Sequence, residues 1–174
     1  MDRVVVVGGP GSGKTTFARC VAGATGAEHV ELDSLWWQRD WVHLRSEELQ
    51  EVVSRLLDKL ERWVVDGNYL DEVGDIVWAR ADTVVWLDLR RRTAFRRAVS
   101  RSVRRVVTRR SLWNGNREQW GVLSPRSLHR LWTRWPTYSA NIDARIHERR
   151  QDVEVVRLTS VDEVRRWLAP FFDH

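Results

Sequence analysis

Residues 4–16 read VVVVGGPGSGKTT, and this stretch decides the fold. Four β-branched residues run without interruption into a glycine-rich turn that ends in Lys14, Thr15 and Thr16. A continuous apolar run of this kind is typical of a strand that is covered on both faces, as in a parallel sheet. The residues after the turn predict a helix from Lys14 to about Gly23. The opening unit is therefore a strand, a glycine turn and a helix.

The turn satisfies the pattern G-x-x-x-x-G-K-[ST], which is typical of a phosphate-binding loop. Its glycines let backbone N–H groups surround phosphate oxygens, and the helix N-terminus adds the positive end of its dipole. Lys14 can reach the outer phosphates of a nucleotide, and the Thr15 hydroxyl can bind Mg²⁺. The alternative is a turn that merely joins strand to helix, but the flanking strand and helix favour phosphate binding. The predicted nucleotide-binding residues are Gly8, Gly9, Pro10, Gly11, Ser12, Gly13, Lys14, Thr15 and Thr16.

The rest of the chain alternates between strand and helix patterns. Further strands are predicted at His29–Leu32, Trp63–Val65, Thr83–Leu87 and Val153–Leu158. Helices are predicted at Arg45–Arg62 with Ser46 as N-cap, at Arg91–Thr108, at Ser127–Ile146 with Pro136 interrupting or kinking it, and from Ser160 onward. Such alternation predicts an α/β fold: the three-layer P-loop NTPase fold, with a five-stranded parallel sheet flanked by helices and an arginine-rich, lid-like helical segment.

Length and composition fit one domain that spans residues 1–174. The apolar fraction of 43% and the charged fraction of 30% are typical of globular chains. No apolar run approaches the ~20 residues that cross a bilayer, so no membrane association is expected. The N-terminus begins a strand rather than a secretory signal. Cys20 is the only cysteine, which fits a reducing compartment, and we expect a cytoplasmic protein.

The net charge of +5 is unevenly distributed. Eleven of the 29 basic side chains lie between Leu89 and Arg117, a stretch without Asp or Glu, so that 18 remain against 24 acidic ones. Arg97 and Arg101 lie one helical turn apart and share a face. The stretch is interpreted as a lid that brings positive charge over a transferring phosphate. A nucleic-acid contact surface and a solvated basic helix are the alternatives.

Two acidic residues follow predicted strands, at the edge where open parallel sheets bind ligands. Asp66 ends one strand and precedes Gly67, the form of a carboxylate that holds Mg²⁺ directly or through water. The alternative is a turn aspartate that caps the next segment. Gly67 permits close approach of a substrate, and Asn68 and Tyr69 are expected to turn their polar ends toward the same cleft. The five histidines show no metal-ligand spacing, and His29 is read as structural or exposed.

Asp33 lies just past the second predicted strand. A carboxylate at this place can accept a proton from an attacking hydroxyl, or can fix a substrate. Trp36, Trp37 and Trp41 follow it and either cover the acceptor or pack the next helix. Of these, Trp36 is assigned to substrate binding, together with Asp33, Gly67, Asn68 and Tyr69.

Four stretches together resemble a known family: GPGSGKTT with its flanking strand and helix, ELD with the tryptophans after it, WVVDGNY at 63–69, and VVWLDL at 84–89 with arginines behind it. They resemble the small P-loop kinases related to adenylate kinase, and within these the group called DNA topology modulation proteins. The resemblance runs from Val4 to about Asn141 and recurs in the final strand and helix. It implies ATP as the nucleotide, an acceptor-binding segment at about 34–62 and a lid at about 97–125.

The resemblance also assigns roles. Asp66-Gly67 matches the Asp-Gly after the third strand of adenylate kinases, and Arg97 and Arg101 match arginines at the lid boundary. The chain departs from that family after Gly67, where adenylate kinases carry Phe-Pro-Arg and this chain carries Asn68, Tyr69 and Leu70. This departure argues against a nucleoside monophosphate acceptor.

The sequence therefore predicts ATP-dependent phosphoryl transfer to a small-molecule acceptor, a class in which nucleotide-like acceptors are still included. Mg²⁺ is expected on Thr15 and Asp66, and the predicted catalytic residues are Lys14, Asp33, Arg97 and Arg101. Two other functions stay open: a nucleic-acid-associated P-loop ATPase, and a nucleotide-binding partner protein without catalysis.

Overall fold

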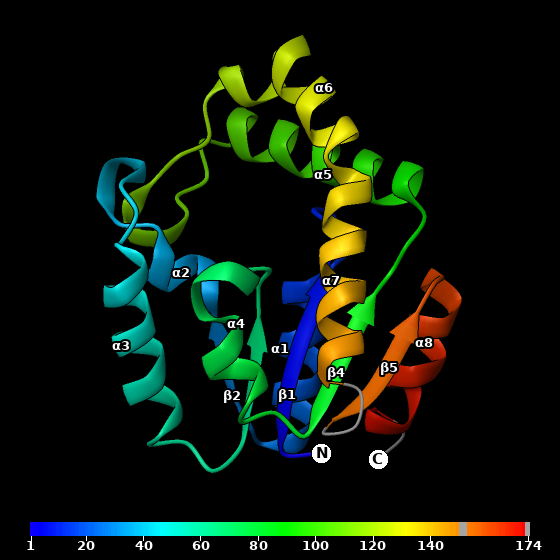
Figure 1. Ribbon diagram of the computed structural model, residues 1–174. Coiled ribbons are helices and arrows are strands. Elements are labelled where there is room, and N and C mark those ends of the chain that lie inside the picture. The colour runs from blue at the N-terminus through cyan, green and yellow to red at the C-terminus, as the bar shows by residue number, and fades with distance from the viewer. Residues whose placement is uncertain (150–152, 173–174) are drawn as a thin grey trace.

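Among the residues that the structure describes, 1–149 and 153–172, five parallel strands form the centre of the computed structural model (Figure 1). Their order is β2-β3-β1-β4-β5, so β1 lies in the middle and pairs with β3 and β4. The strands are β1 (Arg3–Gly8), β2 (Glu28–Glu31), β3 (Trp63–Asp66), β4 (Thr83–Leu87) and β5 (Glu154–Leu158). Because all of them run parallel, their carboxyl ends meet at one edge. The predicted α/β fold with a five-stranded sheet is confirmed.

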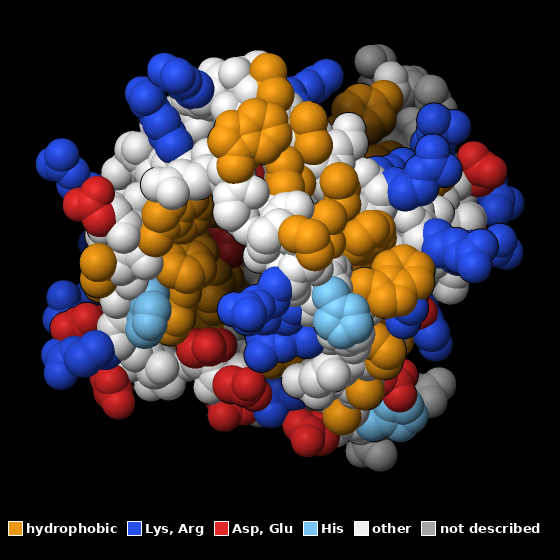
Figure 2. Space-filling model, turned by 90° about the horizontal axis from the view of Figure 1, so that it is seen from above, with side chains coloured by type: hydrophobic (Ala, Val, Ile, Leu, Met, Phe, Trp, Pro, Cys, Tyr) orange, Lys and Arg blue, Asp and Glu red, His pale blue; other side chains and the backbone are white. Residues whose placement is uncertain are grey.

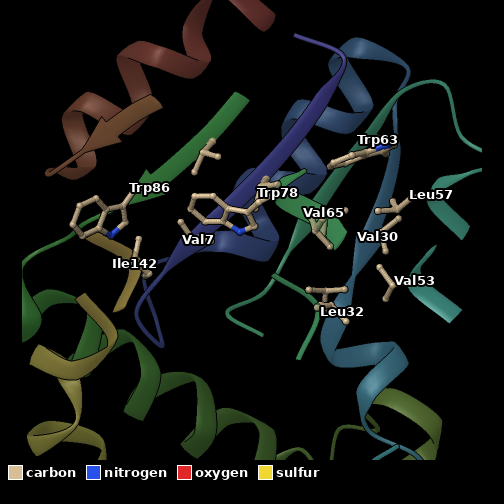
Figure 3. Close-up of a cluster of buried hydrophobic side chains, with 14 of the residues drawn as sticks. Val7, Val30, Leu32, Val53, Leu57, Trp63, Val65, Trp78, Trp86 and Ile142 are labelled. Atoms are coloured by element: carbon tan, nitrogen blue, oxygen red, sulfur yellow. The ribbon is translucent and has the colours of Figure 1, made fainter. Parts of the chain in front are cut away.

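Helices cover both faces of this sheet, which explains the unbroken apolar strands. One face packs against α3 (Ser46–Leu57), α4 (Leu70–Trp78) and α7 (Trp135–Arg149), and the other against α1 (Lys14–Thr25) and α8 (Val161–Leu168). The valines of β1 alternate between the layers: Val5 and Val7 belong to the first core, and Val4 and Val6 to the second. Figure 3 shows the first core, where Trp63, Trp78 and Trp86 lie among aliphatic side chains.

A further segment forms an arch above the carboxyl ends of the strands (Figure 1). It consists of α5 (Arg91–Val107), the short 3₁₀ turns Trp113–Gly115 and Trp120–Leu123, and α6 (Pro125–Thr133). α6 packs against α5 through Trp132. The centre of its ring lies 5.2 Å from that of Phe95, edge-on, and 3.5 Å from the guanidinium carbon of Arg91. None of the described helices is long and apolar enough to span a bilayer.

Two asparagines attach the arch to the segment after β2, which contains α2 (Leu32–Trp36). The Asn114 side chain donates a hydrogen bond to the Trp37 carbonyl at 2.6 Å. The Asn116 side chain donates to the Gln38 carbonyl at 2.7 Å and accepts from the Trp41 backbone N–H at 3.0 Å. The arch is therefore held at both ends, by the sheet at one and by these side chains at the other.

The predicted helix at Arg45–Arg62 is shorter than expected and begins differently. It ends at Leu57, after which the chain turns, yet Leu60 still packs against the core and extends the apolar pattern beyond the helix. Ser46 is not the N-cap: this position belongs to Arg45, whose backbone N–H is bound by the Glu48 carboxylate at 3.1 Å. The Glu48 side chain, three residues after the N-cap, thus accepts a hydrogen bond from the Arg45 N–H, which has no partner within the helix.

The break predicted at Pro136 is confirmed. α6 ends at Thr133 and α7 begins at Trp135, which puts Pro136 in the first turn of α7, where a missing N–H costs nothing. Helices α2 and α4 were not predicted. Both are short and follow directly on strands, so the strand pattern conceals where they begin.

Replacing Ile142 by alanine is expected to lower the free energy of unfolding by about 2–5 kcal/mol. Ile142 is 1% exposed and anchors α7 in the first core, so truncation leaves a cavity. Urea unfolding followed by tryptophan fluorescence measures the loss. The control is Val107→Ala on α5, 63% exposed, for which a change within about 0.5 kcal/mol is expected. Equal losses in the two variants would contradict the role of Ile142.

Candidate functional site

The glycine turn between β1 and α1 has the backbone geometry of a phosphate cradle. Gly11 and Gly13 adopt φ angles of +81° and +99°, which other residues rarely adopt, and Gly13 is the N-cap of α1. Gly11 also permits a close approach of α5, since a Cβ added there would lie 2.1 Å from the Ala94 carbonyl oxygen. Glycine at this position therefore serves both the turn and the packing of the arch.

Lys14 lies folded back over this turn. Its Nζ donates to the Gly8 carbonyl at 2.8 Å and, at 3.4 Å, to that of Gly9. Burial lowers the pKa of Lys14 to about 8, against the opposing charges of Asp66 and Asp33. The ammonium is thus partly stripped of water, and it forms no ion pair with the residues that the structure describes. A bound phosphate would supply the missing negative charge.

Ser12 adds a second unsatisfied group to the turn. Its side chain is 3% exposed, and its hydroxyl has no hydrogen-bond partner among the described residues. Buried hydroxyl groups normally have such a partner. The free hydroxyl, the glycine backbone and the Lys14 ammonium together fit the phosphates of a nucleotide.

Asp66, at the end of β3, lies beside Thr15, which is in the first turn of α1. The Thr15 hydroxyl donates to one Asp66 carboxylate oxygen at 2.6 Å, and His29 Nε2 lies 2.9 Å from the other. Because a carboxylate only accepts, this Nε2 carries a proton. Asp66 is 3% exposed, so both contacts lie inside the protein. His29 was expected to be structural or exposed, and it is a direct partner of the predicted metal ligand.

The described residues contain no group of three or more His, Cys, Asp or Glu side chains placed to hold a metal ion. A Mg²⁺ ion at this site would therefore take few ligands from the protein, namely Thr15 and Asp66, and the remainder from phosphate and water. This is the way in which Mg²⁺ commonly binds beside nucleotide phosphates. The donor set fits magnesium in that manner.

Asn68 lines a cavity beside the glycine turn, and its side-chain amide binds the start of that turn. Its amide N–H donates to the Gly8 carbonyl at 2.6 Å, and its amide oxygen accepts from the Gly8 N–H at 3.1 Å. The side chain thus acts like one more backbone peptide of β3, and continues the pairing with β1 by one step. Gly8 is fixed from both sides, by Asn68 and by Lys14.

Asp33 and Tyr69 form the next contact along the edge. The Tyr69 hydroxyl donates to an Asp33 carboxylate oxygen at 2.5 Å. Burial raises the pKa of Tyr69, and the Asp33 charge raises it further, so the phenol stays protonated at neutral pH. Trp36 lies beside this pair rather than over a cavity: its ring is 5.3 Å from that of Tyr69 and stacks on His43 at 4.7 Å. Trp37, in contrast, lines the first of the two cavities described next.

Two cavities open beside the start of α1, and the glycine turn lines the first of them. We call the first, of about 610 Å³, the α4–α7 cavity; it lies between the turn, the end of β3, the start of α4 and one side of α7. We call the second, of about 910 Å³, the arginine cavity; it lies between the start of α1 and α5. Both are lined by Thr15, Thr16, Asp33 and Arg101. The two spaces therefore meet beside the predicted phosphate site.

The arginine cavity carries a strong positive charge. Two of its arginines are neutralised by ion pairs, Arg19 with Glu31 at 3.1 Å and Arg105 with Glu118 at 2.7 Å. Five more have no side-chain partner among the described residues: Arg96, Arg97, Arg101, Arg104 and Arg110. Burial, and then the charge of Arg105, lower the pKa of Arg101. Both predicted arginines line this cavity, and Arg101 alone of the two also lines the other.

Several lining residues of the α4–α7 cavity were not predicted. Arg134, Tyr138 and Asn141 reach it from α7 and its start, and Asp71 and Glu72 reach it from α4. The spacing of Arg134, Tyr138 and Asn141 places them on one face of a helix, and this signal was present in the sequence. Asp71 and Glu72 could not be recognised without α4.

The model of the ATPase family associated with various cellular activities (AAA) matches residues 4–88, from β1 to the end of β4. The matched part contains the glycine turn and the Asp66 carboxylate. Together with the five-stranded parallel sheet, this match supports a P-loop NTPase fold and nucleotide binding. A search of curated proteins found no match.

The affinity for nucleotide is expected to fall as the pH rises above about 8, the pKa of Lys14. Bound phosphate favours the charged ammonium, so binding above this pH takes up a proton, and Kd rises by up to about tenfold per pH unit. The terminal phosphate, with a second pKa of about 6, is already ionised there. Calorimetric titration with a non-hydrolysable ATP analogue between about pH 7 and pH 9.5 measures the slope. The Lys14→Ala variant should bind the analogue weakly, and its affinity should no longer depend on pH in this range. An unchanged slope in this variant would exclude Lys14 as the titrating group.

Replacing Asn68 by alanine is expected to lower the free energy of unfolding by about 1–3 kcal/mol and to weaken nucleotide binding, because both hydrogen bonds to Gly8 are lost. The matched control is Asn141→Ala, since no hydrogen bond of the Asn141 side chain to the described residues is present. Urea unfolding and analogue binding measure both effects. Equal behaviour of the two variants would show that the Gly8 contacts contribute nothing.

Proposed function

We propose that the protein is a small P-loop kinase that transfers the terminal phosphoryl group of ATP to a hydroxyl of a small molecule. The observation that carries this proposal is the meeting of two cavities at Thr15, Thr16, Asp33 and Arg101. Hydrolysis needs only water beside the phosphate, whereas transfer needs room for a second ligand at the same phosphorus. The α4–α7 cavity offers that room, with a volume of about 610 Å³.

The nucleotide is assigned to the glycine turn and the arginine cavity. The backbone of Gly11 to Thr16, the Lys14 ammonium and the Ser12 hydroxyl would hold its phosphates. Thr15 and Asp66 would hold Mg²⁺, which would supply positive charge beside these phosphates. Arg97 and Arg101 would stabilise the negative charge that spreads over the transferring group.

Asp33 is the proposed general base. It lines both cavities, and Tyr69 fixes one of its oxygens, so the other remains for the acceptor. The acceptor oxygen bonds to the terminal phosphorus as its proton passes to Asp33. The bond from phosphorus to the bridging oxygen breaks, and the nucleoside diphosphate leaves. Tyr69 keeps its own proton because its pKa is raised.

The arch is the proposed lid of a single domain, in the range of about 97–125, and the acceptor-binding segment is the range of about 34–62. The hydrogen bonds of Asn114 and Asn116 to the segment after β2 support this division, because they join the two ranges directly. A closed arch excludes water and thereby favours transfer over hydrolysis. Opening of the lid requires these hydrogen bonds to break.

The proposal is tested by measuring ADP formation with Mg²⁺ and ATP against a panel of small hydroxyl compounds, nucleoside monophosphates, DNA and RNA. ADP in equal amount to a phosphorylated small molecule is the expected result. Stimulation by nucleic acid alone would make the protein a nucleic-acid-associated ATPase, and the arginines a contact surface. Nucleotide binding without turnover under every condition would leave a binding protein without catalysis.

Asp33→Asn is expected to reduce kcat for transfer by about 10²–10⁴-fold, because the amide cannot accept the proton. The affinity for the ATP analogue should change by less than about threefold, since the glycine turn and Lys14 stay intact. Steady-state kinetics and calorimetry separate the two effects. If analogue affinity falls instead and kcat is retained, Asp33 belongs to the metal site.

A further inference from the structure

The two cavities that meet at Thr15, Thr16, Asp33 and Arg101 differ in charge. The arginine cavity has five arginines without a partner. The α4–α7 cavity is lined by four carboxylates, those of Asp33, Asp66, Asp71 and Glu72, and by three cations, Lys14, Arg101 and the exposed Arg134. Away from the glycine turn and from the junction of the two cavities, its charged residues are Asp71, Glu72 and Arg134. We propose that the phosphate acceptor is a hydroxyl compound that carries a cationic amine. This inference rests on the proposed function and names the substrate class for it.

The carboxylates of Asp71 and Glu72 are free to bind such an amine. Neither side chain has a hydrogen bond or an ion pair with the described residues, and Arg134 lies beyond ion-pair distance of both. Both residues are in the first turn of α4, where negative charge also stabilises the helix. Helix stabilisation does not require that the side chains line a cavity, and both of them do.

The walls of the cavity suit a cation as well. Trp37, Tyr69 and Tyr138 line it from three different elements. Aromatic faces attract an ammonium group within about 6 Å of the ring centre. Figure 2 shows a hollow on the upper side of the molecule, with hydrophobic side chains inside it and acidic side chains along one edge. An amine in this cavity would meet carboxylates and aromatic faces together.

A phosphorylated acceptor would meet the opposite environment. A nucleoside monophosphate brings a dianion, which the carboxylates of Asp71 and Glu72 repel. Arg101 and Lys14 lie at the junction and are needed by the transferring phosphate, so Arg134 alone remains to bind the second one. Like charges in a cavity of low dielectric disfavour binding. The charge of the lining thus selects a cationic acceptor over an anionic one.

The test uses pairs of compounds that differ only in charge. Amino alcohols, amino sugars and an aminocyclitol are each compared with their N-acetyl derivatives, and adenosine with its 5′-monophosphate is added as the anionic arm. Formation of ADP and of the phosphorylated product is measured, together with thermal stabilisation of the full chain by each compound in the presence of a non-hydrolysable ATP analogue. The expected result is a preference of about tenfold or more in kcat/KM for the free amine in at least one pair.

A second measurement assigns the preference to the cavity. The double variant Asp71→Asn, Glu72→Gln should lose most of the preference for the amine and keep its affinity for the ATP analogue. The control is Asp162→Asn, on the exposed side of α8 and remote from both cavities, which should retain the preference. A preference that survives in the double variant would overturn the assignment to Asp71 and Glu72.

Failure of this inference is distinguishable from failure of the proposed function. Phosphorylation of neutral or anionic compounds without a preference for amines would overturn the cationic class and leave the kinase intact. If the monophosphate stabilises the protein against heat and none of the amines does, the cationic class of acceptor would also be overturned. ADP formation that no small molecule stimulates would overturn both proposals.

Discussion

The hydrogen bond between Thr15 and Asp66 is the contact on which the rest of the site depends. It joins the first residues of α1 to the end of β3, and it exists because β3 lies directly beside β1. The parallel pairing sets the carboxylate at the same height as the start of the helix. Without this register, the Asp66 carboxylate would not lie beside the Thr15 hydroxyl, and the predicted metal site would lose one of its two protein ligands.

The end of β3 carries two further contacts of this kind. Asp66, Asn68 and Tyr69 each reach a different part of the site: the start of α1, the start of the glycine turn, and the carboxylate of Asp33. A short stretch of backbone thus fixes the phosphate turn, the predicted metal ligands and the proposed base relative to one another. A shift of this stretch would displace all three together, which explains why none of these side chains is left free.

The sequence predicted the sheet and the glycine turn between strand and helix correctly, because long β-branched runs and the glycine pattern are local signals. It predicted less of the α4–α7 cavity. The start of α4 is concealed behind a strand end, and the orientation of Asn68 depends on the neighbouring strand. The roles of Trp36 and Trp37 are equally non-local, since adjacent tryptophans on a short helix point in different directions. Partners from distant parts of the chain are visible only once the chain has folded.

The contact between Gly11 and Ala94 has a mechanical consequence. No side chain separates the backbone of the phosphate turn from the backbone of α5, so nothing soft lies between them to absorb a displacement. A shift of the turn by a bound phosphate would pass directly to a stiff helix of 17 residues. The helix would then act as a lever, whose far end moves further than the turn itself. Occupancy of the phosphate turn would in this way be converted into movement of the arch.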